Sequence, residues 1–85
     1  MSRLERLIVD LTAAVQRLEK RHARGPWVVV CHPDRYALVL LAVEQAPVGA
    51  VQIQRRDSMH PDDVAIGETT RRPIPAEHVE IEDAA

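Results

Sequence analysis

The chain has 85 residues, of which 46% are hydrophobic and 28% charged, with a net charge of −2. These values are typical of one globular domain and exclude a disordered chain. The short length excludes the deep cleft of most enzymes, and the single cysteine excludes an intramolecular disulfide. No apolar run is long enough to cross a bilayer and no secretion signal is visible. We therefore expect a protein that is neither secreted nor inserted in a membrane.

The first predicted element is a helix over residues 3–24. Ser2 and Glu5 match the S-x-x-E capping box that begins many helices, and Gly25 followed by Pro26 predicts its end. Apolar residues recur between these ends at alternating spacings of four and three: Leu4, Ile8, Leu11, Val15 and Leu18. Two interpretations of this stripe stay open. Either the helix lies on the protein's own sheet, or part of it packs against a copy or a partner.

A strand over residues 27–32 and a helix over residues 33–46 come next. The strand sequence W-V-V-V-C is continuously apolar and β-branched, which suits a strand buried on both faces. Pro33 and Asp34 favour the first turn of a helix. From Tyr36 to Val43 this helix is apolar all round, so it must be covered on more than one side. The first helix or a neighbouring chain has to provide that cover.

Two further strands complete the predicted domain, over residues 50–56 and 63–67. The first alternates apolar and polar residues, as a half-buried strand does. Strand, helix and strand at this spacing form a right-handed unit with parallel strands, and residues 63–67 are a candidate hairpin partner of the second strand. We therefore predict an α/β (α+β) fold for residues 1–67. It is a compact αβαβ(β) domain with a long N-terminal helix and a small, mainly parallel sheet.

Residues 68–85 are predicted to form an extended, acidic arm. Pro73 and Pro75 favour an extended chain, and residues 78–82 alternate apolar and polar side chains like an edge strand. Such a strand can add to the exposed sheet edge of another subunit. The alternative is a loosely ordered tail.

The tripeptide His-Pro-Asp occurs twice, at residues 32–34 and 60–62. The first copy follows a strand, at the end where α/β proteins bind ligands. Cys31 and His32 are adjacent on that strand, however, so their side chains point to opposite faces and do not form a nucleophile–base pair. The ligand spacing of a structural zinc site and a glycine-rich phosphate loop are both missing from the sequence. We interpret both tripeptides as turns and helix starts, and predict no catalytic, cofactor-binding or metal-binding residue.

Basic clusters and apolar stripes are the candidates for protein contact. The main basic cluster lies at the end of the first helix, where cations are favoured in any case, and the acidic overall charge argues against nucleic acid. An acidic protein surface is the favoured target, such as residues 77–83 of a neighbouring copy. The predicted interaction residues are Leu4, Ile8, Leu11, Val15, Leu18, Arg17, Lys20, Arg21, Arg24, Arg71, Arg72, Ile74, Val79 and Ile81.

The run V-V-V-C-H-P-D-R-Y-A-L-V-L-L at residues 28–41, followed by V-Q-I-Q at 51–54 and D-V-A-I-G at 63–67, resembles a known group of proteins. These are short helix-strand-helix-strand proteins encoded among the virion genes of actinobacterial tailed phages. The resemblance implies a virion accessory or minor capsid protein rather than an enzyme, and carries over no functional residue.

We therefore expect a non-enzymatic structural or interaction protein, in a virion or the host cytoplasm, within an oligomer or larger assembly. It would dock by its helices and its C-terminal arm. The alternative is a small regulatory adaptor that binds a host protein or nucleic acid through the basic helix face, which consists of Arg17, Lys20, Arg21 and Arg24.

Overall fold

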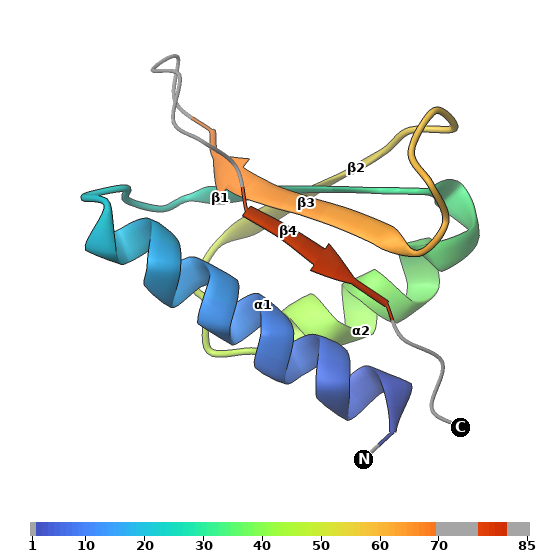
Figure 1. Cartoon of the computed structure of the whole chain (residues 1–85), viewed down its shortest axis with the longest axis horizontal. Coiled ribbons are helices and arrows are strands. Elements are labelled where there is room, and N and C mark those ends of the chain that lie inside the picture. The colour runs from blue at the N-terminus through green and yellow to red at the C-terminus, as the bar shows by residue number, and fades with distance from the viewer. Residues whose placement is uncertain (1, 70–76, 82–85) are drawn as a thin grey trace.

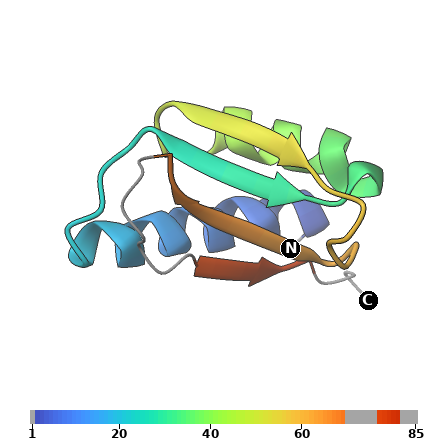
Figure 2. The same ribbon diagram turned by 90° about the horizontal axis from the view of Figure 1, so that it is seen from above.

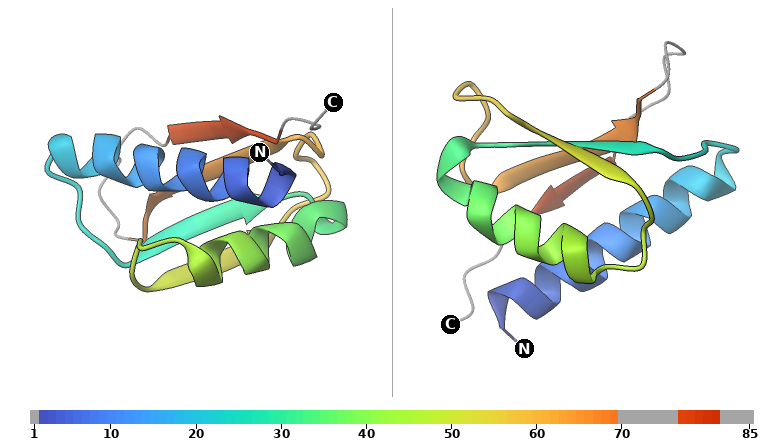
Figure 3. Two further views of the ribbon diagram at one scale, coloured as in Figure 1. Left: turned by 90° about the horizontal axis from the view of Figure 1, so that it is seen from below. Right: turned by 180° about the vertical axis from the view of Figure 1, so that it is seen from behind.

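The computed structural model describes residues 2–69 and 77–81. In chain order its elements are α1 (Arg3–Lys20), β1 (Trp27–Cys31), a 3₁₀ turn (Pro33–Arg35), α2 (Tyr36–Gln45), β2 (Val51–Arg55), β3 (Asp63–Glu68) and β4 (Glu77–Glu80). The four strands form one sheet, and α1 and α2 lie side by side on the same face of it (Figures 1 and 3). Figure 2 shows the opposite face, which neither helix covers. The predicted α+β class is confirmed.

The sheet is mixed, with the strand order β2-β1-β3-β4. β1 and β2 run parallel, whereas β3 is antiparallel to β1 and β4 is antiparallel to β3. The prediction of a mainly parallel sheet is therefore wrong. The parallel strands β1 and β2 finish at the same end of the sheet, so the chain that leaves β2 can turn back beside either of them. It passes the end of β1 and pairs with the far side of that strand, instead of forming a hairpin with β2.

The core lies between the sheet and the two helices. Along β1, Trp27, Val29 and Cys31 are buried beneath the helices, whereas Val28 and Val30 are only half-buried on the opposite face. The prediction that this strand is covered on both faces is thus wrong for the part of the chain that the structure describes. The cause is that both helices pack on the same face of the sheet, so the side chains of β1 on the other face have no helix above them.

The beginning of α1 is as predicted. The Ser2 hydroxyl accepts a hydrogen bond from the backbone N–H of Glu5 at 3.1 Å. The Glu5 carboxylate in turn accepts the backbone N–H of Ser2 at 3.4 Å, which completes the capping box. These bonds satisfy donors that the first turn of a helix leaves without partners.

The end of α1 differs from the prediction, because the helix stops at Lys20 and not at residue 24. His22 takes the left-handed conformation, with φ at 67°. The backbone N–H of Ala23 then bonds to the carbonyl of Leu18 at 3.0 Å, as in a Schellman motif, and both of these side chains are buried. A histidine therefore occupies the position that was expected for Gly25, and the burial of Ala23 holds the turn in place.

The predicted helix over residues 33–46 is a 3₁₀ turn followed by α2. Pro33 stands in the first turn, as expected, and the backbone of Ala46 leaves the helical conformation. Neither α1 nor α2 combines the length and the apolarity that crossing a bilayer requires.

Residues 77–80 form strand β4 of the chain's own sheet. Val79 of β4 pairs with Val64 of β3, and the strand lies beside α1 (Figure 1). This part of the chain was expected in an extended arm that reaches another subunit. Within the same chain, the outer edge of β3 and the apolar side of α1 offer the alternating strand a place where Val79 and Ile81 become buried. Residues 70–76 and 82–85 of the predicted arm lie outside the described residues.

Candidate functional site at the His-Pro-Asp end

The two His-Pro-Asp turns lie where the parallel strands finish. His32 follows β1, and residues 60–62 directly precede β3. In each turn the histidine Nδ1 accepts the backbone N–H of the aspartate at 3.1 Å. The histidine carbonyl accepts the backbone N–H of the residue that follows the aspartate, Arg35 or Asp63, at 2.9 Å. Both tripeptides are therefore the same turn used twice, and only the first also begins a helix. Because Nδ1 accepts a hydrogen bond, a neutral ring carries its proton on Nε2.

Asp62 connects the two turns and the end of β4. The Arg35 guanidinium, which follows the first turn, donates to Asp62 Oδ1 at 3.0 Å. The backbone N–H of Ile81 donates to the Asp62 carbonyl at 2.7 Å. Three segments that are far apart in the sequence thus meet at one residue. These contacts hold Asp62 and Ile81 in place at the second turn.

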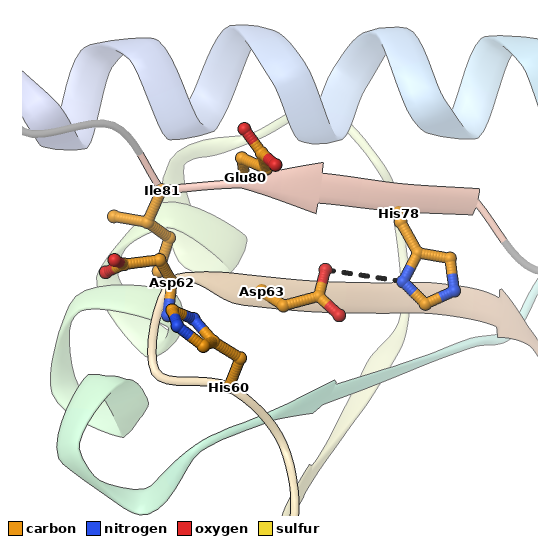
Figure 4. A pocket seen from close by; sticks show the side chains of 6 residues that line it. All are labelled: His60, Asp62, Asp63, His78, Glu80 and Ile81. Carbon is orange, nitrogen blue, oxygen red and sulfur yellow. Dashed lines mark hydrogen bonds and ion pairs between the residues drawn. The ribbon is translucent and has the colours of Figure 1, made fainter.

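An open hollow of about 760 Å³ lies beside the second turn. Figure 4 shows its lining residues, which come from this turn, β3, β4 and the residue after β4: His60, Asp62, Asp63, His78, Glu80 and Ile81. Asp63 and His78 point toward each other from neighbouring strands, with Oδ1 and Nδ1 3.3 Å apart. The hollow therefore presents two imidazoles and three carboxylates, and its polar side chains are open to solvent. Water competes for such groups, which weakens each polar contact that they make.

The described residues at this end of the sheet provide neither a metal-ligand cluster nor an accessible thiol. Within residues 2–69 and 77–81, no three side chains of histidine, cysteine, aspartate or glutamate are placed to hold a metal ion. The Cys31 side chain is fully buried. Burial raises the pKa of this thiol, and the nearby Arg55 guanidinium lowers that pKa only in part. Cys31 is therefore protonated at neutral pH and closed to solvent, whereas a nucleophilic cysteine needs an accessible thiolate.

The predicted contact stripe of α1 is used inside the chain. Leu11, Val15 and Leu18 are buried, while Leu4 and Ile8 are partly buried and pack against the same core. The helix contacts α2, β3 and β4. Of the two interpretations of the stripe, the structure has the one in which the helix lies on its own sheet. The three buried side chains are closed to a partner, which corrects their assignment as contact residues.

The basic end of α1 is partly neutralised within the chain. Arg17 Nε lies 3.1 Å from Glu77 Oε2, and Arg21 Nη2 lies 2.6 Å from Glu77 Oε1. The contact expected between this cluster and acidic residues 77–83 of a neighbouring copy is thus made to residue 77 of the same chain. Lys20 and Arg24 are exposed, so half of the predicted cluster remains accessible.

The other predicted contact residues lie in residues 68–85, the predicted C-terminal arm. Val79 and Ile81 are buried at 4% exposure each, which corrects their assignment as docking side chains. Arg71, Arg72 and Ile74 lie outside the described residues.

Two surfaces that the structure leaves open contain none of the predicted contact residues. The outer face of α2 exposes Ala37 and Leu41, with Leu40 half-buried beside them, and Glu44 is the first charged residue of the helix. The all-round apolar character of this helix was the available signal, since α1 covers only one side of it. The second surface is the outer edge of β2. Its position at the end of the sheet depends on strand order, which the sequence pattern does not specify.

No protein-family model, no curated protein and no solved structure matches this chain.

Proposed function

We propose that the chain is a non-enzymatic structural or interaction protein: a small accessory subunit of a phage-like assembly, such as a minor capsid or virion protein. Its partners are other protein subunits or further copies of itself, and it acts in a virion or the host cytoplasm. The outer face of α2, formed by Ala37, Leu40 and Leu41, is the surface through which it docks.

The observation that carries the proposal is the exposed aliphatic side of α2. Leu41 is 47% exposed, and Leu40 beside it is only half-buried. A surface helix normally places charged and polar side chains on its outer face. On α1, Glu5, Arg6 and Gln16 follow this rule, although Val9 is 52% exposed. Contiguous exposed apolar side chains on a small domain mark a contact with another macromolecule. A neighbouring subunit on α2 supplies the cover that α1 leaves incomplete.

The adaptor alternative has less support. Its basic helix face would need Arg17 and Arg21 to be free, and both are paired with Glu77, whose side chain is only 13% exposed. A partner would have to compete with these ion pairs or to use Lys20 and Arg24 alone.

Light scattering over a range of protein concentration tests the proposal. We expect the wild-type chain to have a solution mass above its monomer mass of 9.5 kDa at high concentration. The double substitution Leu40→Glu/Leu41→Glu should return the mass to that of the monomer. Association would bury the two carboxylates without an opposite charge beside them, which is costly.

The matched control is Gln16→Glu/Ser58→Glu, which adds the same charge at exposed polar positions outside α2 and removes no apolar surface. It should associate as the wild type does, and circular dichroism should be equal for all three proteins. A wild-type chain that stays monomeric at every concentration excludes further copies as the partner, and an associating Leu40→Glu/Leu41→Glu variant contradicts docking through α2.

A further inference from the structure

Strand β2 is an open edge of the sheet. In the part of the chain that the structure describes, its one hydrogen-bonded neighbour is β1. Two main-chain bonds show how the strand is oriented. The carbonyl of Ala50 accepts from Trp27, and the N–H of Arg56 donates to the carbonyl of Cys31. Even-numbered residues of this segment therefore direct their main-chain groups toward β1.

Successive residues of a strand direct their N–H and C=O groups to opposite sides. Val51, Ile53 and Arg55 consequently point these groups away from β1, into the open edge. Unpaired edges of this kind template the addition of another strand. Proteins that remain monomeric protect such edges with charged side chains, proline or a bulge, and Val51–Arg55 contains no proline and a single charge, at its last residue.

The side chains of this edge match a second copy of themselves. When two β2 strands pair antiparallel about a two-fold axis at Ile53, all five residues of each strand overlap. Ile53 faces its own copy and exchanges both main-chain hydrogen bonds with it, since its groups already point outward. Gln52 then faces Gln54 of the second copy, so neutral amides meet and no like charges are opposed. An axis at Arg55 would instead place two arginines opposite each other.

Helix α2 extends the same surface. The Arg55 guanidinium carbon lies 4.7 Å from the centre of the Tyr36 ring, which places the Tyr36 side of α2 next to β2. Leu40 and Val43 share that side of the helix, at spacings of four and three. All three side chains are only half-buried. Figure 2 shows α2 running beneath the β2 edge, so a two-fold axis perpendicular to the sheet brings the two α2 helices together on one face.

The size of the interface also requires the helix. A stable dimer buries about 800 Å² per partner. The accessible surface of this chain is 5463 Å², so such an interface takes roughly a seventh of it. A five-residue strand is too small alone, so Tyr36 and Leu40 beside it have to add apolar area, whereas Val43 packs against the chain's own core.

We infer that β2 and the adjoining side of α2 form a two-fold seam with a second copy of this chain, in which antiparallel β2 strands join two four-stranded sheets into one. The inference rests on the proposed function through Leu40, which the docking face and the seam share: the first neighbour that α2 contacts there is another copy. An extended peptide of a different protein is the competing occupant of this edge.

A charge-swap series tests the seam and its register. Gln52 and Gln54 lie beside Val28 and Val30 in the chain's own sheet, so charges there face no charge within the monomer. In the seam, Gln52→Lys/Gln54→Lys places like charges opposite each other twice. We expect the dimer to dissociate at least about tenfold more readily than the wild type, with circular dichroism unchanged.

The opposite arrangement should restore association. Gln52→Lys/Gln54→Glu places each lysine against a glutamate of the other copy, so the wild-type dimer mass should return. Mixing Gln52→Lys/Gln54→Lys with Gln52→Glu/Gln54→Glu should likewise give a dimer that neither forms alone. Gln16→Lys/Gln45→Lys controls for net charge, since it adds the same charge away from the edge.

The outcomes separate this inference from the proposed function. If the wild type associates and Leu40→Glu/Leu41→Glu dissociates it, but the charge-swap proteins all behave alike, the seam is wrong and the function proposal stands. Association of the like-charge variant as tight as that of the opposite-charge variant also overturns the seam. A wild-type chain that is monomeric throughout overturns the seam, and added edge-strand peptides then test the competing occupant.

Discussion

The two edges of the sheet are built in opposite ways. At the β4 edge, α1 lies alongside the strand, Arg17 and Arg21 pair with Glu77, and Val79 is buried. At the β2 edge, the side chains up to Gln54 are uncharged, and the main-chain groups of every second residue point outward. One edge is closed by contacts within the chain, and the other keeps the features of a strand that accepts a partner.

This difference shows how a small domain can control where it associates. An 85-residue chain has too little core to cover every apolar surface that its helices and strands create. Here the cover is concentrated on one side, beneath α1 and next to β4. Among the described residues, the large apolar side chains that stay exposed are Val9 on α1 and Leu41 on α2, and the β2 edge adds main-chain groups that a partner can bond.

The burial difference between the edges gives the largest expected effect. Val79→Ala should lower the free energy of unfolding by about 2 kcal/mol, because it removes two buried methyl groups from the β4 side. Val51→Ala makes the same change at the half-buried β2 edge and should cost less than half as much in the monomer. Urea unfolding of both variants measures the comparison. Equal losses would show that the two edges are packed alike.

The ion pairs at the β4 edge give a smaller effect. Glu77→Gln should lower the free energy of unfolding by about 1 kcal/mol, since both arginines lose a charged partner but remain close to half exposed. The control Glu80→Gln, at an exposed position of the same strand, should leave the free energy almost unchanged. The difference should shrink at high salt. An equal loss of unfolding free energy in Glu77→Gln and Glu80→Gln would show that the ion pairs do not stabilise this edge.

The smallest effect concerns Cys31, which pairs with Arg55 of β2 in the sheet register. Burial raises the pKa of its thiol above 9.0 in the folded chain. Above pH 9.0 the unfolded chain releases this proton first, so the free energy of unfolding should fall as pH rises toward the folded pKa. Below pH 9.0 the thiol is protonated in both states and contributes no pH dependence.

Cys31→Ala isolates this contribution. Because it removes the thiol, the variant should lose less stability than the wild type between neutral pH and pH values above 9.0. Arg55→Gln should have the opposite effect, since Arg55 lowers this pKa. Parallel pH profiles of the wild type and Cys31→Ala would contradict the buried position of the thiol.

Local signals in the sequence predicted the local structure well. Ser2 and Glu5 form the capping box that their spacing indicates, and Pro33 begins the turn before α2. The end of α1 was missed because His22 has no glycine signature. Its left-handed conformation depends on the burial of Ala23, which is a tertiary contact.

Contacts between distant segments were less predictable. The pairing of β3 with β1 instead of β2 reversed the expected character of the sheet, because alternation specifies a strand and not its neighbour. The same limit applied to the contact residues. The spacing of the stripe that ends with Leu18 fits both a core and an interface, and only the position of the sheet decides between them. Nothing in the sequence around Ile53 indicates that its strand lies at the edge of the sheet.

The position of Trp27 also makes the proposed seam easy to study. It is the only tryptophan in the chain, it is 4% exposed, and it begins the central strand β1 between β2 and β3. Its fluorescence emission should therefore shift to longer wavelength when the sheet comes apart. The outer edge of β2 lies one strand away, so dimer formation should leave the emission maximum in place. A single optical reading can thus distinguish a variant that has only lost its partner from one that has lost its fold.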